Sequence, residues 1–334
     1  MTDSKTLDFE EELLGALYKF NSKYFPVPEY KYNVRNGLMD EKTYSQEKEQ
    51  EFLPIYLNLV DAYEIKLLQD NPDNFLDKWF TQHIRSEIDV VYSEIQKITS
   101  TNTKKLLSVI LSRTIRSCRA TTHADLATLN KPVTTTYYCS KHGKICKPLF
   151  SILKWWITYT KDTMKRVLHF DKLRTDSMQA CVTGDSRNVD LIDRVAIINY
   201  SLAGLIRTQK IKGIFSSPPY VGLIDYHEQH AYAYDLFGFE RHDELEIGPL
   251  HKGQTKEAQV SYSEGIISVL NNCKKYFCPD YDVFLVANDK YNLYPKIADK
   301  AGMRIIHKYK RPVLNRTEKD KGAYSEIIFH LKGK

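Results

Sequence analysis

Glycine is scarce in this chain: among 334 residues there are 14 glycines, and no two of them are separated by a single residue. Loops whose backbone closely approaches a nucleotide need glycine, because a side chain would block the approach. The sequence therefore excludes a cofactor-binding loop of the G-x-G type from this chain.

Long apolar runs are absent as well. No stretch approaches the roughly 18 consecutive apolar residues of a membrane span. The segment 1–15 lacks the basic and then apolar pattern of a secretory signal. Six cysteines are too few for a disulfide scaffold in so long a chain. We therefore expect a cytoplasmic protein without a membrane segment.

The overall composition is that of a globular protein, with 42% hydrophobic and 27% charged residues. The formal net charge is +6. This mild positive excess permits a polyanionic partner such as nucleic acid but does not require one.

The first half of the chain has the periodicity of helices. Segment 1–50 is polar and begins with an amphipathic stretch, and its run 40–51 is predicted to be a connector or an exposed helix. Apolar residues recur at helical intervals in three series between residues 52 and 118, and again over Leu149–Val167. Segment 119–150 between them is Thr-rich and aperiodic. We predict a mainly helical region over 51–178.

From residue 179 to 334, short β-rich runs alternate with helical ones, which predicts an α/β fold with a largely parallel sheet. The last two strands lie so close in sequence that we expect an antiparallel pair. The expected strands are Ala180–Thr183, Gly213–Ser216, Val283–Ala287, Met303–Tyr309 and Ser325–Leu331, and the expected helices are Ala231–Phe237, Tyr262–Lys275 and Tyr291–Ala301.

The most informative motif is the run Ser216-Ser217-Pro218-Pro219-Tyr220 at the end of an expected strand. Ligands of open α/β sheets bind at the carboxyl ends of the strands. Two prolines make a rigid turn without N–H donors, so that the turn presents carbonyl acceptors beside an aromatic ring.

An exocyclic base amine fits such a turn. Acceptors that hold both amine hydrogens favour sp³ nitrogen and direct its lone pair at an electrophilic methyl group. A ring such as that of Tyr220 could stack on a base extruded from the duplex, with about 1–3 kcal/mol for each stacked base. The structural alternative is an ordinary turn between a strand and a loop.

The run Ser217–Tyr220 resembles motif IV of the amino-directed DNA methyltransferases, (Asp/Asn/Ser)-Pro-Pro-(Tyr/Phe/Trp), in the serine form of the N4-cytosine branch. Further stretches of residues 180–334 resemble other parts of that family: a GDSR run at 184–187, the polar strand end at 283–289, and the closing strands at 302–310 and 324–329 with the basic loop 311–317 between them. The resemblance implies S-adenosylmethionine as cofactor, near Asp185, Ser216 and Ser217, and catalysis at Ser217, Pro218, Pro219 and Tyr220.

Two polar segments are candidates for contacts with the target base or with DNA. One follows motif IV and contains Asp225, Tyr226, His227 and Glu228, of which His227 or Glu228 could contact the cytosine edge or relay a proton. The alternative is helix capping by Asp225 with polar surface behind it. The second segment is basic, with Lys310, Arg311 and Arg316.

The resemblance lacks one part, because the family's glycine-rich first motif has no counterpart in this sequence. The family sheet has the strand order 3-2-1-4-5-7-6. The loop of Asp185 would follow strand three and the loop of Ser217 strand four, with strands one and two missing from this chain. Unpaired strand edges are avoided in soluble proteins. We therefore expect an incomplete Rossmann-like sheet that a partner chain with the cofactor motif completes.

A Cys-x₂-His-x₃-Cys spacing joins Cys139, His142 and Cys146, and Cys118 and His123 lie upstream. Two thiolates and an imidazole could share a zinc ion, with Cys118 or His123 as the fourth ligand. Buried free cysteines are the alternative. The possible zinc segment is 118–146.

The sequence thus predicts a subunit of a split methyltransferase that acts on double-stranded DNA, with cytosine N4 favoured over adenine N6, in a restriction–modification system. On this interpretation, region 51–178 recognises the target sequence. Two alternatives stay open: a non-catalytic DNA-recognition subunit with the same fold, and an RNA base-amine methyltransferase.

Overall fold

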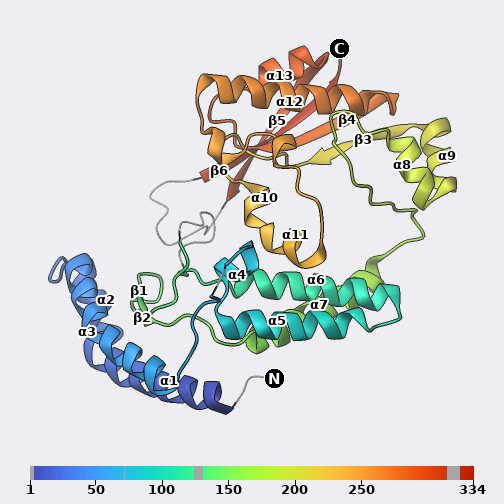
Figure 1. The fold of residues 1–334 in the computed structure, drawn as a ribbon. Coiled ribbons are helices and arrows are strands. Elements are labelled where there is room, and N and C mark those ends of the chain that lie inside the picture. The colour runs from blue at the N-terminus through green and yellow to red at the C-terminus, as the bar shows by residue number, and fades with distance from the viewer. Residues whose placement is uncertain (1–3, 71, 124–130, 314–323) are drawn as a thin grey trace. The chain divides into compact units, whose positions relative to one another are not determined.

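The computed structural model describes residues 4–70, 72–123, 131–313 and 324–334. The chain divides into two compact units (Figure 1). The helical unit comprises 1–173 and 228–241, and the α/β unit comprises 174–227 and 242–334. Residues 228–241 thus belong to the helical unit, although they lie within the predicted α/β region 179–334. None of the described helices is long and apolar enough to cross a membrane.

The helical unit confirms the predicted helical first half. Its elements are α1 (Ser4–Tyr24), α2 (Glu29–Arg35), α3 (Glu41–Ala62), α4 (Phe75–Trp79), α5 (Gln82–Gln96), α6 (Thr101–Ser117), β1 (Tyr137–Cys139), β2 (Lys144–Cys146), α7 (Leu153–Leu173), α10 (Tyr226–Gln229), which spans the boundary between the units, and α11 (Ala231–Phe237). Side-chain caps explain several starts: Asp40 accepts from the Thr43 N–H at α3, and Ser100 from the Thr103 N–H at α6. The acidic run 40–51 is therefore the capped first half of a long helix.

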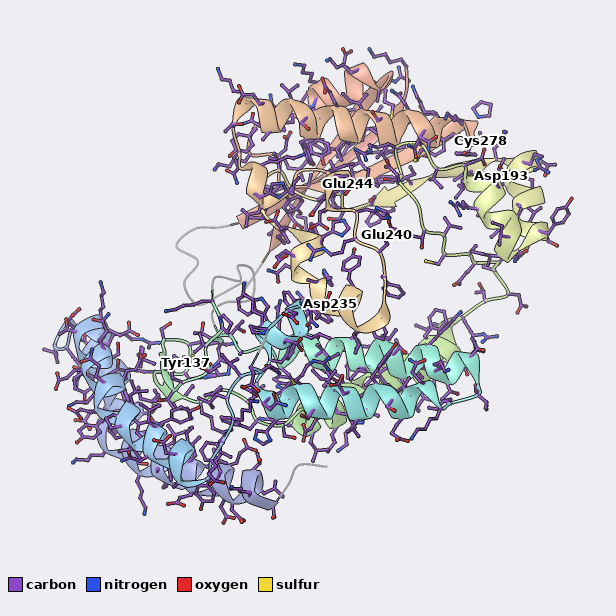
Figure 2. The ribbon with its side chains drawn as sticks, viewed as in Figure 1. Tyr137, Asp193, Asp235, Glu240, Glu244 and Cys278 are labelled. Atoms are coloured by element: carbon purple, nitrogen blue, oxygen red, sulfur yellow. The ribbon has the colours of Figure 1, made fainter. Side chains whose placement is uncertain are left out.

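Two large hydrophobic cores and one small one lie among the described residues of this unit. One large core lies between α1, α3 and the β1–β2 hairpin and includes Phe9, Phe52 and Phe150, all 0% exposed. The other large core lies among α4, α5, α6 and α11 and includes Tyr232 and Leu236 of α11. The α11 residue Asp235 accepts the Phe75 N–H at 2.8 Å, which fixes the first turn of α4 (Figure 2).

The α/β unit contains a four-stranded sheet. Its strands are β3 (Ile211–Ser216), β4 (Phe277–Ala287), β5 (Met303–Val313) and β6 (Tyr324–Gly333), in the order β3-β4-β6-β5. The pair β3–β4 is parallel, and β6 is antiparallel to both of its neighbours. The parallel pair and the closing antiparallel pair were both predicted. The predicted strand Ala180–Thr183 was wrong, because these residues form no regular element.

Four helices and two short 3₁₀ turns complete the α/β unit: α8 (Leu191–Ile198), α9 (Tyr200–Gln209), η1 (Asp243–Leu245), η2 (Leu250–Lys252), α12 (Lys256–Lys274) and α13 (Tyr294–Lys300). The helices α12 and α13 cover one sheet face and pack on alternate residues such as Val283, Leu285 and Phe329. The other face carries a row of rings across all four strands: Phe215, Phe284, His330 and His307 are successive register partners. Phe215 on the edge strand is 74% exposed.

Candidate functional site

The Ser-Pro-Pro-Tyr loop begins where β3 ends, as the sequence predicts. Ser216 is the last strand residue, and residues 217–220 continue as irregular chain. Ser217 is exposed, whereas Pro218, Pro219 and Tyr220 are half-buried. Since β3 and β4 are parallel, the polar residues Asn288 and Asp289 after β4 lie at the same edge of the sheet.

Tyr220 is anchored from the neighbouring strands. Its hydroxyl donates to Glu326 Oε1 of β6 at 2.6 Å, and Glu326 Oε2 is 3.2 Å from Arg311 Nη1 of β5. The Tyr220 ring also packs at the border of the sheet core. The phenol therefore has a fixed direction, which a side chain needs if it is to present one ring face to a planar ligand.

The chain directly after this loop is braced. The Gly222 N–H donates to the Gly248 carbonyl at 3.0 Å, and the Gln254 amide donates to the Gly222 carbonyl at 3.3 Å. Gly222 has φ +60°, and a Cβ there would lie 2.2 Å from the Gly253 carbonyl oxygen. Only glycine fits this close crossing. The brace holds the far end of the loop as β3 holds its near end.

Asp289 is a half-buried carboxyl group at the same edge of the sheet as the loop. It accepts the N–H groups of Leu293 at 2.6 Å and Tyr294 at 3.4 Å, at the start of α13. Burial raises the pKa of Asp289, and the two N–H bonds work against that rise. The Tyr294 hydroxyl is 2.9 Å from the Tyr262 hydroxyl of α12. The sequence predicted only the polar end of the strand at 283–289. Tyr262 and Tyr294 were not predicted, because their sequence context is that of ordinary core aromatics.

The residues of segment 225–228 have separate partners. The Asp225 carboxylate accepts the His251 N–H at 3.1 Å, and the Tyr226 N–H donates to Glu246 at 2.7 Å. His227 Nδ1 is 3.9 Å from Asp243 Oδ1, and Glu228 is 3.3 Å from Arg241. Asp225 thus braces the loop of η2, a role that neither of the predicted alternatives had included.

Two of the three basic candidates, Lys310 and Arg311, lie on β5. Lys310 is exposed and paired in register with Ile327 of β6, and Arg311 is engaged with Glu326. Arg316 lies outside the described residues.

Asp185 is not brought together with Ser217. Its carboxylate accepts from the N–H, Nε and Nη2 groups of Arg187, and this partner lowers the pKa of Asp185. The buried Asn272 side chain, near the end of α12, donates to the Ser186 and Val189 carbonyls. Because α12 leads into the start of β4, this loop is attached at the amino ends of the strands, whereas Ser217 follows a carboxyl end. None of the described hydrogen bonds or ion pairs joins Asp185 to Ser217, and their shared cofactor site stays a prediction.

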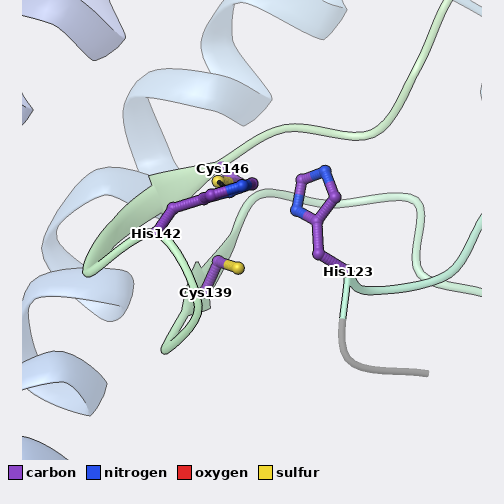
Figure 3. A group of neighbouring side chains, drawn as sticks. All are labelled: His123, Cys139, His142 and Cys146. Carbon is purple, nitrogen blue, oxygen red and sulfur yellow. Dashed lines mark hydrogen bonds between the residues drawn. The ribbon is translucent and has the colours of Figure 1, made fainter. Parts of the chain in front are cut away.

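A second cluster lies in the helical unit, where His123, Cys139, His142 and Cys146 converge (Figure 3). One potential ligand atom of each lies within 4.8 Å of the others. The predicted alternative Cys118 is not in this group. It ends α6 and is buried in the core of α4, α5 and α6.

Comparison with known proteins gives one informative similarity. The chain is similar to the Type II methyltransferase M.MjaII of Methanocaldococcus jannaschii, with 44% identity over 331 residues. The aligned region covers 97% of this chain but 62% of the relative, so that the chain spans less than two thirds of that protein. No solved structure matches the chain. No protein-family model matches it either.

Proposed function

We propose that this chain is the motif IV part of a DNA methyltransferase that transfers a methyl group from S-adenosylmethionine to an exocyclic base amine, cytosine N4 in preference to adenine N6, within a restriction–modification system. The observation that carries the proposal is the Ser-Pro-Pro-Tyr loop at the carboxyl end of a parallel strand. The similarity to a protein named as a Type II methyltransferase supports it.

The sheet order is a second support. The order β3-β4-β6-β5, with β6 antiparallel between parallel strands, corresponds to strands 4-5-7-6 of the order 3-2-1-4-5-7-6. The Ser-Pro-Pro-Tyr loop then follows strand four, as motif IV does in that family. The remaining strands would pair with the outer edge of β3.

We propose that a second polypeptide supplies those strands and the glycine-rich cofactor motif. β3 is an edge strand in the described sheet, and its Phe215 is 74% exposed. Edge strands with exposed apolar side chains are usually protected by a partner. More than a third of the relative has no counterpart in this chain, which is compatible with a missing cofactor-binding part.

The chemistry assigned to this chain is the positioning of the amine. S-adenosylmethionine supplies an electrophilic methyl group when bound. The Ser217 hydroxyl oxygen and carbonyl oxygens of the Ser217–Pro219 turn would accept the amine hydrogens, and the Tyr220 ring would stack on the base. The turn would hold the amine so that its lone pair could form the new N–C bond, with the cofactor sulfur as the leaving group and one amine proton released. Such a displacement needs orientation and exclusion of water more than a nucleophile.

The cofactor residues proposed here are Ser216 and Ser217, with a partner chain providing the glycine-rich side. Asp185, the third cofactor candidate, would have to release Arg187 to reach the cofactor. Double-stranded DNA would contact Lys310, Arg311 and Arg316 through phosphates and would be recognised by region 51–178. The segment 225–228 would line the base pocket.

The test is a methylation assay with labelled S-adenosylmethionine and duplex DNA, on this chain with the polypeptide encoded beside it. Ser217→Ala and Tyr220→Ala should each lower methylation at least 100-fold and leave DNA binding within about threefold. Tyr220→Phe keeps the ring and removes only the hydroxyl contact with Glu326, so it should retain more activity than Tyr220→Ala. Tyr32→Ala, at a tyrosine that is 63% exposed on α2, is the control.

Each other outcome has a defined meaning. Methylation that survives both alanine substitutions would remove the catalytic assignment. Full activity of this chain alone would refute the split. DNA binding without methylation in any assembly would leave a recognition subunit, and methylation of RNA alone would make it an RNA enzyme. Mass analysis of the digested nucleosides decides between N4-methylcytosine and N6-methyladenine.

A further inference from the structure

The cluster of His123, Cys139, His142 and Cys146 joins three separate pieces of the helical unit (Figure 3). His123 follows α6, Cys139 ends β1, His142 lies in the turn of the hairpin, and Cys146 ends β2. The hairpin pairs Tyr137 with Cys146 and Cys139 with Lys144, so that both thiols are fixed by strand register. The hairpin and the chain after α6 thus contribute two sulfur and two nitrogen donors to one point.

The spacing of the donor atoms suits a tetrahedral ion. Zinc bonds of about 2.3 Å to sulfur and 2.0–2.1 Å to nitrogen give tetrahedron edges of roughly 3.3–3.8 Å. His142 Nδ1 lies 3.4 Å from Cys146 Sγ, and all four ligand atoms lie within 4.8 Å of one another. Shifts of about 1 Å in the remaining distances would close the tetrahedron.

His123 has a polar contact that holds its ring beside the hairpin. The Tyr137 hydroxyl is 2.9 Å from His123 Nδ1. The rings of His123 and His142 are 4.5 Å apart at 69°, so that neither ring covers the other.

The two faces of the hairpin are buried differently. Ile145 packs into the large core with α1 and α3, whereas Tyr137, Cys139 and Cys146 form a small cluster with Val133. So small a core stabilises a fold poorly, and small domains of this kind are commonly closed by a metal. Two thiolates would neutralise Zn²⁺, so nearby lysines such as Lys141 and Lys144 would not oppose the complex.

We propose that these four residues bind one structural Zn²⁺ ion. A Cys₂His₂ set favours zinc over hard cations such as Mg²⁺ or Ca²⁺. Four protein ligands leave no open position, so the ion has no catalytic role. The hairpin is bound to α1 through Asn21, whose side chain pairs with both the N–H and the carbonyl of Ile145 at 2.9 and 3.0 Å. The ion therefore links the end of α6 to the N-terminal helices.

The test is the metal content of the purified full chain, measured by mass spectrometry after removal of loosely bound ions. We expect about one zinc per chain, and tetrahedral thiolate absorption in the visible range when Co²⁺ replaces it. Cys139→Ser combined with Cys146→Ser should lower zinc at least tenfold. The matched controls are Cys118→Ser, at a buried cysteine outside the cluster, and Cys181→Ser, at an exposed one; both should keep the zinc.

A second measurement covers the case in which the double variant fails to fold. Chelation of the unmodified chain should lower its melting temperature and expose Cys139 and Cys146, but not Cys118, to alkylation. A zinc-free wild-type chain that gains no stability from added Zn²⁺ would overturn the proposal. Full retention of zinc by a folded double variant would overturn it as well. Neither measurement depends on methylation, so failure here leaves the proposed function intact.

Discussion

The two units bury their apolar surface in different ways. The helical unit has two large cores, formed by different sets of helices. Phe52 lies in one and Ile84 in the other, and both are 0% exposed. The α/β unit has one main core, between the sheet and the helices α12 and α13, and it leaves a row of rings on the other face. The α/β unit therefore keeps exposed apolar surface on one sheet face, as at Phe215, which is 74% exposed.

The largest expected effect is a difference in stability between substitutions on the two faces of the sheet. Phe329, which is 0% exposed and stacks on Tyr294 at 4.7 Å, belongs to the covered face. Phe329→Ala should lower the free energy of unfolding by about 3–5 kcal/mol, measured by urea denaturation. Phe215→Ala, on the other face, should change it by less than about 0.5 kcal/mol, as expected for a surface site. Equal losses at both positions would show that the second face is covered within this chain.

Two glycines, one in a strand and one in a helix, test how closely β3 and β4 approach each other. A Cβ at Gly213 of β3 would lie 2.0 Å from the Asp282 carbonyl oxygen, whereas one at Gly204 of α9 would meet nothing within 4 Å. Gly213→Ala should cost about 1–3 kcal/mol of stability through overpacking. Gly204→Ala should stabilise by about 0.5–1 kcal/mol because alanine favours the helix. The melting temperatures should therefore move in opposite directions, and a shared direction would contradict the close approach of β3 and β4.

A buried hydroxyl pair compares polar contacts in the two units. Tyr294→Phe should cost about 1–2 kcal/mol, because it leaves the buried Tyr262 hydroxyl without its 2.9 Å partner. In the helical unit, the half-buried Tyr159 hydroxyl is 2.7 Å from Ser117 Oγ. Tyr159→Phe should cost less than about 1 kcal/mol, because water can replace the lost bond. Thermal unfolding of both variants checks the ranking, and a larger loss at Tyr159 would reverse it.

The smallest expected effect is the change with pH in the stability that Asp282 contributes. Asp282 lies on the sheet face that carries the row of rings. Asp282 Oδ1 is 2.6 Å from His330 Nε2, and this hydrogen bond, aided by Lys332, holds the pKa of Asp282 below its usual 3.8. A lowered carboxyl pKa stabilises the fold above the unfolded value, and that stabilisation disappears as the pH falls through the folded value. The difference in melting temperature between wild type and Asp282→Asn should therefore shrink below about pH 4. A difference that stays constant from pH 6 to pH 3 would contradict the ion pair.

The sequence predicted the second half of the α/β unit well because its strands pair with one another. Strand β3, its proline loop and the closing pair β5–β6 lie where the sequence indicates. Ala180–Thr183 looks like a strand by composition, but a strand needs a neighbour, and no described strand lies beside it. The hairpin β1–β2 was missed because strands of three residues give no periodicity.

The candidate sites show the same limit. The Ser-Pro-Pro-Tyr loop and three members of the Cys/His cluster are local in sequence and could be predicted from their spacing. The contact between Tyr220 and Glu326 joins residues 106 positions apart, and the choice of His123 over Cys118 depends on where α6 ends. Such long-range pairings follow from tertiary packing, which spacing does not contain.

The path of the chain through α11 has a practical consequence. After the proline loop, the chain enters the helical unit for residues 228–241 and then returns. A fragment that ends at residue 173 would lack Tyr232 and Leu236. The core of α4, α5 and α6 would then contain a cavity where these side chains pack. A fragment that begins at residue 174 would carry the apolar side of α11 without its packing partners. The two units are thus inseparable by a single cut, and expression of either half alone should give aggregation or partial unfolding.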